Sequence, residues 1–272
     1  MHALSFPIRG RALSMSVETS SHLAHVDSRF QAIDVYETAA FGRVLLLDGH
    51  IQLAELDERA YHECLVRIPM LNLKHARRVL VVGGGDGGAV RELCRFPGLT
   101  AIDMVEIDQS VIDVCREHLP AVSSGAFEDS RVTVHVADAF NFVKTVEGAY
   151  DFVVLDSTDT YEGETGELSE ALFTQEFYAD VSRALAPGGY VVTQADNPVF
   201  CAYSLVKIQR QLSSVFLHTG HYLGLVPSFG GYSAYVYGTF GNPLRKTWDN
   251  DWKSTAYLSE TTYNLAFSGL TF

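Results

Sequence analysis

Cysteine is scarce in this sequence: four residues lie far apart, and no two of them form a C-x-x-C pair. A zinc site built from cysteines and a disulfide framework both need paired spacings, so neither is expected. Isolated cysteines of this kind are typical of small buried hydrophobic side chains in a reducing compartment. We therefore predict a cytoplasmic protein without a bound metal. The four cysteines are Cys64, Cys94, Cys115 and Cys201.

The chain also lacks a long apolar stretch, a cleavable signal and an excess of basic residues. No apolar run approaches the roughly 20 residues of a membrane-spanning helix. Residues 1–18 have arginines but no apolar core before a cleavage site, so we interpret them as a loose, flexible leader. The 20 Lys and Arg against 33 Asp and Glu give a net charge of −13. This charge repels nucleic acid and anionic membranes and favours cationic ligands, although solubility alone also explains it.

The first part of the chain has a β pattern followed by a helical one. Residues 30–53 contain apolar runs on both sides of Asp48-Gly49, a pair typical of a two-residue β-hairpin turn. Residues 55–71 carry apolar side chains at four-residue spacing, which indicates a helix. Tyr61, His62 and Glu63 lie on its central turn.

From residue 77, apolar runs alternate with helical segments, including 139–146 and 170–186. Such alternation is typical of a doubly wound sheet, whose ligands bind at the carboxyl ends of the strands. Residues 221–240 contain two strands around a Pro/Gly-rich turn and predict a closing antiparallel hairpin. We therefore predict an α/β protein. A small N-terminal β-hairpin or sheet domain (1–54) precedes a Rossmann-like, methyltransferase-type doubly wound sheet (55–272).

A glycine-rich loop directly follows the first strand of the second domain. Residues 83–88 fit G-x-G-x-x-G, which alone has many false positives. Glu106 supports a nucleoside-binding site. It ends the next strand, 18 residues past Gly88, where a carboxylate can bind both hydroxyls of a ribose. Asp86 within the loop would repel a pyrophosphate. The loop therefore favours a cationic nucleoside, such as a sulfonium, over a dinucleotide.

Further acidic residues follow the later strands. Asp138-Ala139 closes the third strand, where such folds commonly hold an adenine edge; the alternative is a helix N-cap, and both roles can coexist. Asp156 and Asp159 at the tip of the fourth strand can point into one cavity, although ordinary turns also favour Asp there. The segment 159–167 has four carboxylates and two glycines. It is either a lid over a polycation or an exposed connector.

Together these motifs resemble those of the spermidine synthase family, in order and over nearly the whole chain from about residue 28. A plain methyltransferase would not be expected to carry the N-terminal β unit or the Tyr-His-Glu helix. The combination is far more specific than any one piece. The matching motifs are SRFQAIDVYET, FGRVLLLDGHIQL, DERAYHE, VVGGGDGG, VEID and VLDSTD, with weaker matches at LFTQEFY and TAYLSETTYNLAF.

The resemblance implies a polyamine aminopropyltransferase that transfers the aminopropyl group of decarboxylated S-adenosylmethionine to putrescine, with no cofactor besides this co-substrate. It implies Asp156 as the base that deprotonates the amine, and a homodimer or homotetramer. No nucleic-acid or membrane partner is expected. The implied donor-binding residues are Gln31, Gln52, His62, Gly83, Gly85, Asp86, Glu106, Ile107, Asp138 and Ala139. The implied acceptor-binding residues are Tyr61, Glu63, Ser157, Asp159 and Phe229.

The acceptor side departs from the family pattern. Asp159-Thr160 replaces the usual Asp-Pro, and Phe229 stands where the family commonly has a substrate-facing tyrosine. Agmatine or a longer polyamine is therefore an alternative acceptor. An S-adenosylmethionine-dependent methyltransferase and a non-catalytic homologue are the rival interpretations. Asp86 and Asp156 argue against the first because they would crowd the carboxylate of the intact donor.

Overall fold

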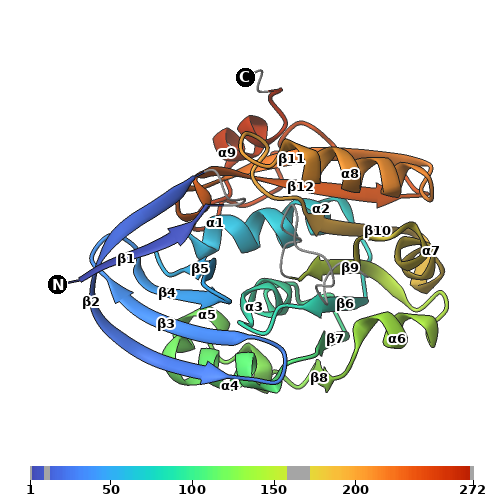
Figure 1. The fold of residues 1–272 in the computed structure, drawn as a ribbon. Coiled ribbons are helices and arrows are strands. Elements are labelled where there is room, and N and C mark those ends of the chain that lie inside the picture. Colours follow the sequence, from blue (N-terminus) through green and yellow to red (C-terminus); the bar gives the residue numbers. More distant parts are fainter. Residues whose placement is uncertain (1, 9–12, 158–171, 270–272) are drawn as a thin grey trace.

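Figure 1 shows the computed structural model of the chain, which describes residues 2–8, 13–157 and 172–269. Within these residues the strands form one five-stranded and one seven-stranded sheet. None of the helices in this part of the chain combines the length and the apolar character that a membrane crossing requires. The predicted order, an N-terminal β domain followed by an α/β domain, is confirmed.

The N-terminal sheet is antiparallel, with its strands in sequence order. β4 and β5 are joined by Asp48 (φ 48°) and Gly49 (φ 76°). Both lie in the left-handed region that a tight two-residue hairpin requires, so the predicted turn is confirmed. The strands are β1 (His2–Pro7), β2 (Ser14–Asp27), β3 (Ala32–Thr38), β4 (Gly42–Leu47) and β5 (His50–Ala54).

The described part of residues 1–18 is not a loose leader. Apart from the residues outside the described ranges, they form β1 and the start of β2, paired so that Leu4 lies opposite Val17. Phe6 and Ile8 are each 1% exposed. A Cβ on Gly230 would lie 2.6 Å from Ile8 Cγ2, so the buried partner of this segment is more than 200 residues away. The prediction failed because the sequence around residues 1–18 does not show this partner.

The predicted helix at 55–71 is present as three consecutive segments. They are α1 (Glu58–His62), the π-helical turn η1 (Glu63–Arg67) and α2 (Ile68–Asn72). α1 lies between the N-terminal sheet and the β11–β12 hairpin (Figure 1). Single π-helical turns within helices often occur at functional sites. Here the turn directly follows Tyr61 and His62.

The second sheet has the order β11-β12-β10-β9-β6-β7-β8. β6 to β10 are parallel, and the β11–β12 hairpin is antiparallel, as predicted. Its strands are β6 (Arg78–Gly83), β7 (Ala101–Glu106), β8 (Val132–Val136), β9 (Tyr150–Asp156), β10 (Leu185–Gln194), β11 (His218–Val226) and β12 (Gly231–Thr239). The remaining helices are α3 (Gly88–Cys94), α4 (Gln109–His118), α5 (Pro120–Ser123), η2 (Ala126–Glu128), α6 (Ala139–Lys144), α7 (Gln175–Ala184), α8 (Ala202–Ser213), η4 (Pro227–Phe229) and α9 (Glu260–Ala266).

The strand order reverses between β6 and β9. From β6 the chain continues outward through β7 and β8, then returns to add β9 and β10 on the other side. In open α/β sheets, ligands bind in the crevice at such a switch point, outside the carboxyl ends of the strands. The glycine loop after β6 and Asp156 at the end of β9 both lie there.

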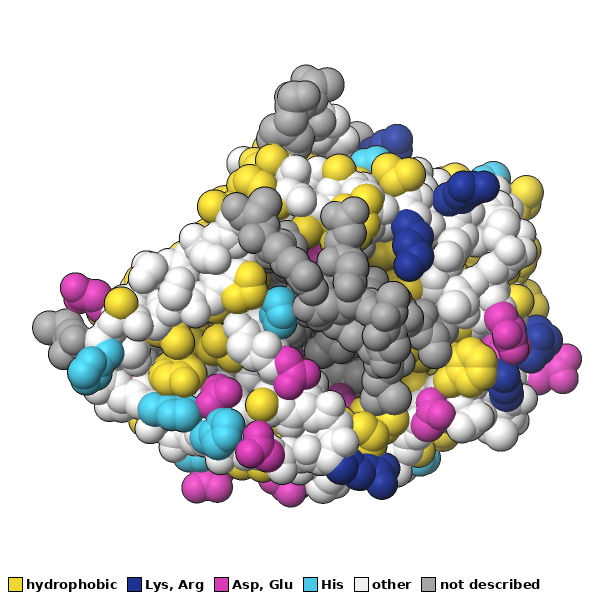
Figure 2. Space-filling view, in the orientation of Figure 1, with side chains coloured by type: hydrophobic (Ala, Val, Ile, Leu, Met, Phe, Trp, Pro, Cys, Tyr) yellow, Lys and Arg dark blue, Asp and Glu magenta, His cyan; other side chains and the backbone are white. Residues whose placement is uncertain are grey.

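Charged side chains are unevenly distributed on the face shown in Figure 2. Lys and Arg side chains are scattered over the right-hand side, around the second sheet. His and acidic side chains gather at the lower left, over β2, β3 and α4.

Candidate active site

The candidate site begins where β6 and β9 end side by side. Asp156 is the register partner of Gly83, and the Gly84 N–H donates to the Asp156 carbonyl oxygen at 3.0 Å. Gly83 has a φ of 78°, and a Cβ there would lie 2.3 Å from that carbonyl oxygen. Only glycine permits this approach, so the loop and Asp156 lie directly against each other.

α1 contributes two side chains that contact Asp156 and the glycine loop. The Tyr61 hydroxyl donates to Asp156 Oδ1 at 2.7 Å, and His62 Nε2 lies 3.2 Å from Asp86 Oδ1. His62, Asp86 and Asp156 each have a polar atom within 4.8 Å of the other two. Asp156 Oδ2 is buried with no hydrogen-bond partner among the described residues. Such an oxygen is costly to bury alone, so it marks a position where a donor such as an ammonium group fits.

The two carboxylates of this cluster differ in acidity. Burial, reinforced by Asp86, raises the pKa of Asp156 to about 6, although His62 and Tyr61 oppose the shift. Burial also works against the charge of Asp86, but His62 and the Gly88 N–H, which donates at 2.6 Å, leave its pKa below the ordinary value. The pair therefore combines a stable anion with a carboxylate that can accept a proton near neutral pH.

His62 is held as an imidazolium by carboxylates on both sides. Its Nδ1 lies 2.9 Å from Glu58 Oε2, and its Nε2 faces Asp86. Burial opposes the charge, but Asp86 and Glu58 outweigh it and raise the pKa of His62 to about 10. The charged ring in turn fixes the position of Asp86.

Behind His62 lies a buried network of alternating charges. Arg91 donates two hydrogen bonds to Glu58, at 2.9 and 2.8 Å, and a third from Nε to Glu92 at 2.9 Å. Glu92 also accepts from Arg67 Nε at 2.6 Å. Burial alone would raise the pKa of Glu58, but His62 and Arg91 lower it to about 2. The network anchors α1 against α3.

A second set of hydrogen-bonded polar side chains joins the N-terminal sheet to the end of β7. Burial raises the pKa of Glu106 to about 7, although the backbone N–H of Asp108 donates to it at 3.0 Å. Asp108, the N-cap of α4, accepts from the Ser28 hydroxyl at 2.6 Å and from Gln31 Nε2 at 3.2 Å. A Cβ on Gly85 would lie 3.1 Å from Glu106 Oε2. Gln31, Gly85 and Glu106 are therefore brought to one edge, and their contact with the donor stays a prediction.

The next turn of the same edge carries Asp138. Its side chain accepts from the backbone N–H two residues on at 2.8 Å, which confirms the N-cap alternative for α6. The Ala137 N–H donates to the Glu106 carbonyl oxygen at 3.0 Å, so this turn lies beside the end of β7. Ala139 is buried in the first turn of α6, and Ile107 directly follows Glu106. Contact of these residues with an adenine ring stays a prediction.

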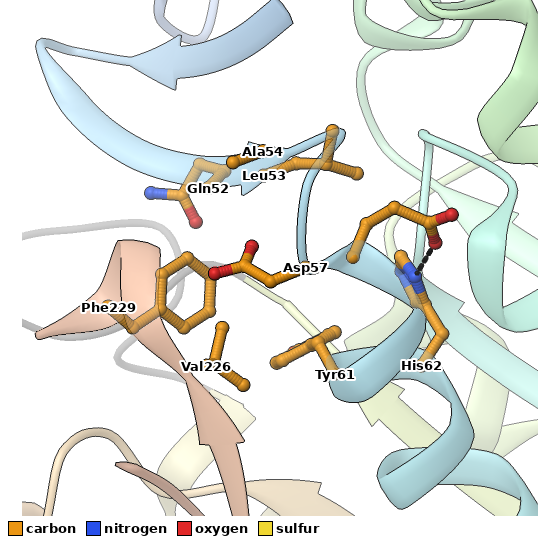
Figure 3. Close-up of a pocket in the computed structure, with 9 residues that line it drawn as sticks. Gln52, Leu53, Ala54, Asp57, Tyr61, His62, Val226 and Phe229 are labelled. Carbon is orange, nitrogen blue, oxygen red and sulfur yellow. Dashed lines mark hydrogen bonds and ion pairs between the residues drawn. The ribbon is translucent and has the colours of Figure 1, made fainter. Parts of the chain in front are cut away.

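A small pocket adjoins Tyr61 (Figure 3). The Phe229 ring meets Tyr61 edge to face, with centroids 5.7 Å apart, and Gln52 reaches toward the pocket from β5. Asp57 accepts from the backbone N–H and hydroxyl of Ser228 at 2.7 and 2.8 Å, which fixes η4 to the start of α1. The lining residues are Gln52, Leu53, Ala54, Asp57, Glu58, Tyr61, His62, Val226 and Phe229.

Glu63 contacts the C-terminal segment rather than the Tyr61–Asp156 cluster. Its Oε2 accepts from the Thr255 hydroxyl and from the N–H groups of Tyr257 and Leu258, at 3.1 and 2.8 Å. Successive side chains of a helix diverge by about 100°, so Glu63 does not follow the direction of Tyr61. Its predicted place at the distal end of the acceptor gains no support from these contacts.

Two other predicted acceptor residues follow Asp156 in the sequence. Ser157 directly follows Asp156, and its carbonyl oxygen accepts from Gln194 Nε2 at 3.4 Å. Asp159 and the segment 159–167 lie outside the described residues.

Four residues that shape the site are absent from the sequence prediction: Asp57, Glu58, Arg91 and Asp108. Glu58 had a usable signal, because it precedes His62 by four residues on a predicted helix. Asp108 stands directly before a helix, where an N-cap is expected. Asp57 and Arg91 had no local signal, because their partners are distant in the sequence.

A methyl group at Gly88 would collide with the His62 ring. A Cβ there would lie 2.2 Å from His62 Cε1, and His62 is only 1% exposed. We expect Gly88→Ala to displace the imidazole and to lower the free energy of unfolding by about 1–3 kcal/mol, as overpacking does. Denaturant titration measures the loss. Gly98→Ala is the matched control, since a Cβ on Gly98 meets only the Ala76 carbonyl oxygen at 3.7 Å. Equal stability of the two variants would contradict the predicted collision.

Comparisons with known proteins agree over both domains. Residues 58–243 match the family described as "Spermine/spermidine synthase domain", and residues 5–55 match the "Spermidine synthase tetramerisation domain". A polyamine aminopropyltransferase of Moorella thermoacetica is 37% identical over 259 residues, which cover 94% of this chain and 89% of the relative. One of Alkaliphilus oremlandii is 38% identical over 216 residues, or 79% of this chain and 74% of the relative.

Solved structures show the same fold. A spermidine synthase in complex with the transition state analogue AdoDATO superposes with a TM-score of 0.92 at 28% identity, covering 99% of this chain and 92% of the other. The spermidine synthase of Thermotoga maritima gives a TM-score of 0.90 at 27% identity, with the same coverage of 99% and 92%.

Proposed function

We propose a reaction from the premise that this chain belongs to the spermine/spermidine synthase family and is a polyamine aminopropyltransferase. The donor is decarboxylated S-adenosylmethionine, and the default acceptor is putrescine. The products are spermidine and methylthioadenosine. No further cofactor takes part.

One observation carries the proposal: Asp86 and Asp156 lie together beside a glycine loop, and a buried oxygen of Asp156 has no hydrogen-bond partner among the described residues. An aliphatic amine is protonated at neutral pH and cannot attack carbon. Asp156 accepts its proton, assisted by a raised pKa and oriented by Tyr61. The freed nitrogen then bonds to the propyl carbon next to sulfur. The carbon–sulfur bond breaks with its electrons passing to sulfur, which becomes a neutral thioether.

In this proposal the donor lies along the carboxyl ends of β6, β7 and β8. Glu106 accepts from the ribose hydroxyls, and Asp86, fixed by His62, binds the ammonium of the aminopropyl group. The remaining donor contacts come from Gln31, Gln52, Gly83, Gly85, Ile107, Asp138 and Ala139.

The acceptor lies on the Tyr61 side, bordered by Asp156, Ser157 and Phe229, with Asp159 and Glu63 as further predicted contacts. Phe229 offers a ring edge but no hydroxyl, so it can pack on a methylene chain without a polar contact. Agmatine or a longer polyamine is therefore the alternative acceptor.

Product analysis tests the reaction. Purified protein is incubated with decarboxylated S-adenosylmethionine and putrescine, agmatine or spermidine, and the products are identified by mass spectrometry. We expect methylthioadenosine with all productive amines and the highest kcat/KM with putrescine. A preference for another amine would change the acceptor only. The absence of methylthioadenosine with every amine would refute the transfer.

Donor selectivity separates this proposal from a methyltransferase. The carboxylate of intact S-adenosylmethionine would face Asp86 and Asp156, so we expect the decarboxylated donor to bind at least about tenfold more tightly. Calorimetric titration compares the two nucleosides. Methylthioadenosine, which lacks both the amine and the carboxylate, is the control for nucleoside contacts alone. Equal affinities for the two donors would favour the methyltransferase.

We further propose a homotetramer, with a homodimer as the alternative, because residues 5–55 match a tetramerisation domain. A cytoplasmic location and the lack of nucleic-acid and membrane partners stay predictions from the isolated cysteines and the negative charge.

A further inference from the structure

Two histidines and an aspartate converge on the surface of the N-terminal sheet, away from the candidate active site. His22 Nε2 lies 2.7 Å and His25 Nδ1 lies 2.9 Å from Asp34 Oδ1. The three polar atoms all lie within 4.8 Å of one another. His22 and His25 belong to β2, and Asp34 belongs to β3. Figure 2 shows His and acidic side chains gathered over these strands.

An irregularity in β2 brings the two histidines to one face. In a regular strand, residues three apart point to opposite faces of the sheet. Here the pairing with β3 shifts register between His22 and Ala24, so that His22 lies opposite Tyr36 and His25 lies opposite Asp34. Tyr36 and Asp34 are two apart on β3 and therefore share a face, and so do their partners. Bulges often serve to redirect a side chain, and this one aligns two imidazoles.

Each imidazole is also oriented by a second contact. The His22 ring stacks on Tyr36, with centroids 4.2 Å apart and an angle of 8° between the planes. His25 uses Nδ1 toward Asp34, while its Nε2 lies 3.5 Å from Asp27 Oδ2. A carboxylate behind the far nitrogen of a histidine is the usual outer contact of a zinc-binding imidazole, because it fixes which nitrogen faces the metal.

The distances between the three ligand atoms suit a metal ion after a small outward movement of the side chains. Zinc binds nitrogen and carboxylate oxygen at about 2.0–2.2 Å, so neighbouring ligand atoms of a tetrahedral site lie roughly 3.3 Å apart. The observed separations of 2.7 and 2.9 Å would have to open by about half an ångström. Both histidines are exposed, with side chains 41% and 51% accessible, so rotation about their side-chain bonds can provide this.

We infer that His22, His25 and Asp34 form a binding site for a divalent transition-metal ion of the zinc class. Imidazole nitrogen is a preferred ligand of these ions, and the carboxylate supplies a third ligand with a negative charge. The isolated cysteines exclude only a cysteine-based site. The ion binds within residues 5–55, takes no part in aminopropyl transfer, and cross-links β2 to β3.

Zinc titration of the full chain tests this site. We expect the wild type to bind Zn²⁺ and to gain thermal stability from it, whereas His25→Ala and Asp34→Asn bind at least about tenfold more weakly and lose that gain. His135→Ala is the matched control, because His135 contacts a single carboxylate, Asp103, at 2.8 Å and lies on the other sheet. This control should bind as the wild type does.

The variants also separate this site from the active site. His62, Asp86 and Asp156 form another group with close ligand atoms, but they are unchanged in all three variants. Zn²⁺ bound there would be retained by His25→Ala and Asp34→Asn. If both variants bind as many Zn²⁺ ions as the wild type, or if the wild type binds none at millimolar concentration, the inference is overturned. Asp34→Asn preserves side-chain size, so it stays informative if His25→Ala does not fold.

Discussion

Asp156→Asn lowers turnover by about a hundredfold or more, and the variant stays folded. The amide has the same shape but cannot take the proton of the amine. The variant stays folded because the substitution also removes a buried negative charge beside Asp86. In the wild type, the repulsion between these two carboxylates raises the pKa of Asp156. Steady-state kinetics, donor titration and denaturant unfolding together measure the effect. Near-normal turnover would show that Asp156 is structural and that another group accepts the proton.

The pH profile distinguishes a lost base from a distorted site. Because the pKa of Asp156 is about 6 in the free protein, we expect kcat/KM of the wild type to fall as pH drops through about 6. The residual activity of Asp156→Asn should lack the part of this limb near pH 6 and keep only the pH dependence that Glu106, with a pKa of about 7, imposes on donor binding. The free energy of unfolding changes with pH in the opposite direction to the activity. A raised carboxyl pKa means that the folded state binds the proton more tightly than the unfolded state. The contribution of Asp156 to stability therefore increases as pH falls from 7 through 6 toward 4.

Arg91→Met lowers the free energy of unfolding by about 3–5 kcal/mol, because it leaves buried carboxylates without their partner. Arg91 is 4% exposed and donates to Glu58, to Glu92 and, at 2.6 Å, to the Val122 carbonyl oxygen. Methionine keeps the apolar stem and removes the charge. Denaturant titration at neutral pH measures the loss. Turnover should also fall, since Glu58 orients His62.

Two comparisons make this prediction specific. Arg116→Met is the matched control, because Arg116 and Glu128 are exposed and 3.6 Å apart, and such pairs contribute up to about 1 kcal/mol. Adding Glu58→Gln to Arg91→Met should recover part of the loss, because it removes one unpaired charge. If Arg91→Met lowers the free energy of unfolding no more than Arg116→Met does, then water or another cation reaches Glu58.

The sequence predicted elements and positions whose signals are local. Apolar runs ending in Gly83, Glu106 and Asp156 identified parallel strands, and the strand ends then met at one edge, because parallel strands impose this. Asp48-Gly49 identified a turn for the same local reason. Polar contacts between distant segments gave no such signal. Arg91 meets Glu58 across 33 residues.

Glu63 shows that the contacts of a residue do not follow from its motif alone. The family resemblance implies a place for it near the distal end of the acceptor, and this role stays a prediction. Its partners Tyr257 and Leu258 come from nearly 200 residues later in the chain. Adjacency in a helical motif therefore does not establish a shared site, because each residue turns to a different neighbour.

The hydrogen bonds to Asp108 set a limit on modular exchange within the family. Ser28 and Gln31 lie in the part matched by the tetramerisation domain, whereas Asp108 lies in the part matched by the synthase domain. A chimera that joins residues 5–55 of one relative to the rest of another cuts across these contacts. Such a hybrid keeps the hydrogen bonds between β3's entry and the N-cap of α4 only if the three side chains are inherited together. The two regions match separate family models, but their contacting side chains depend on each other.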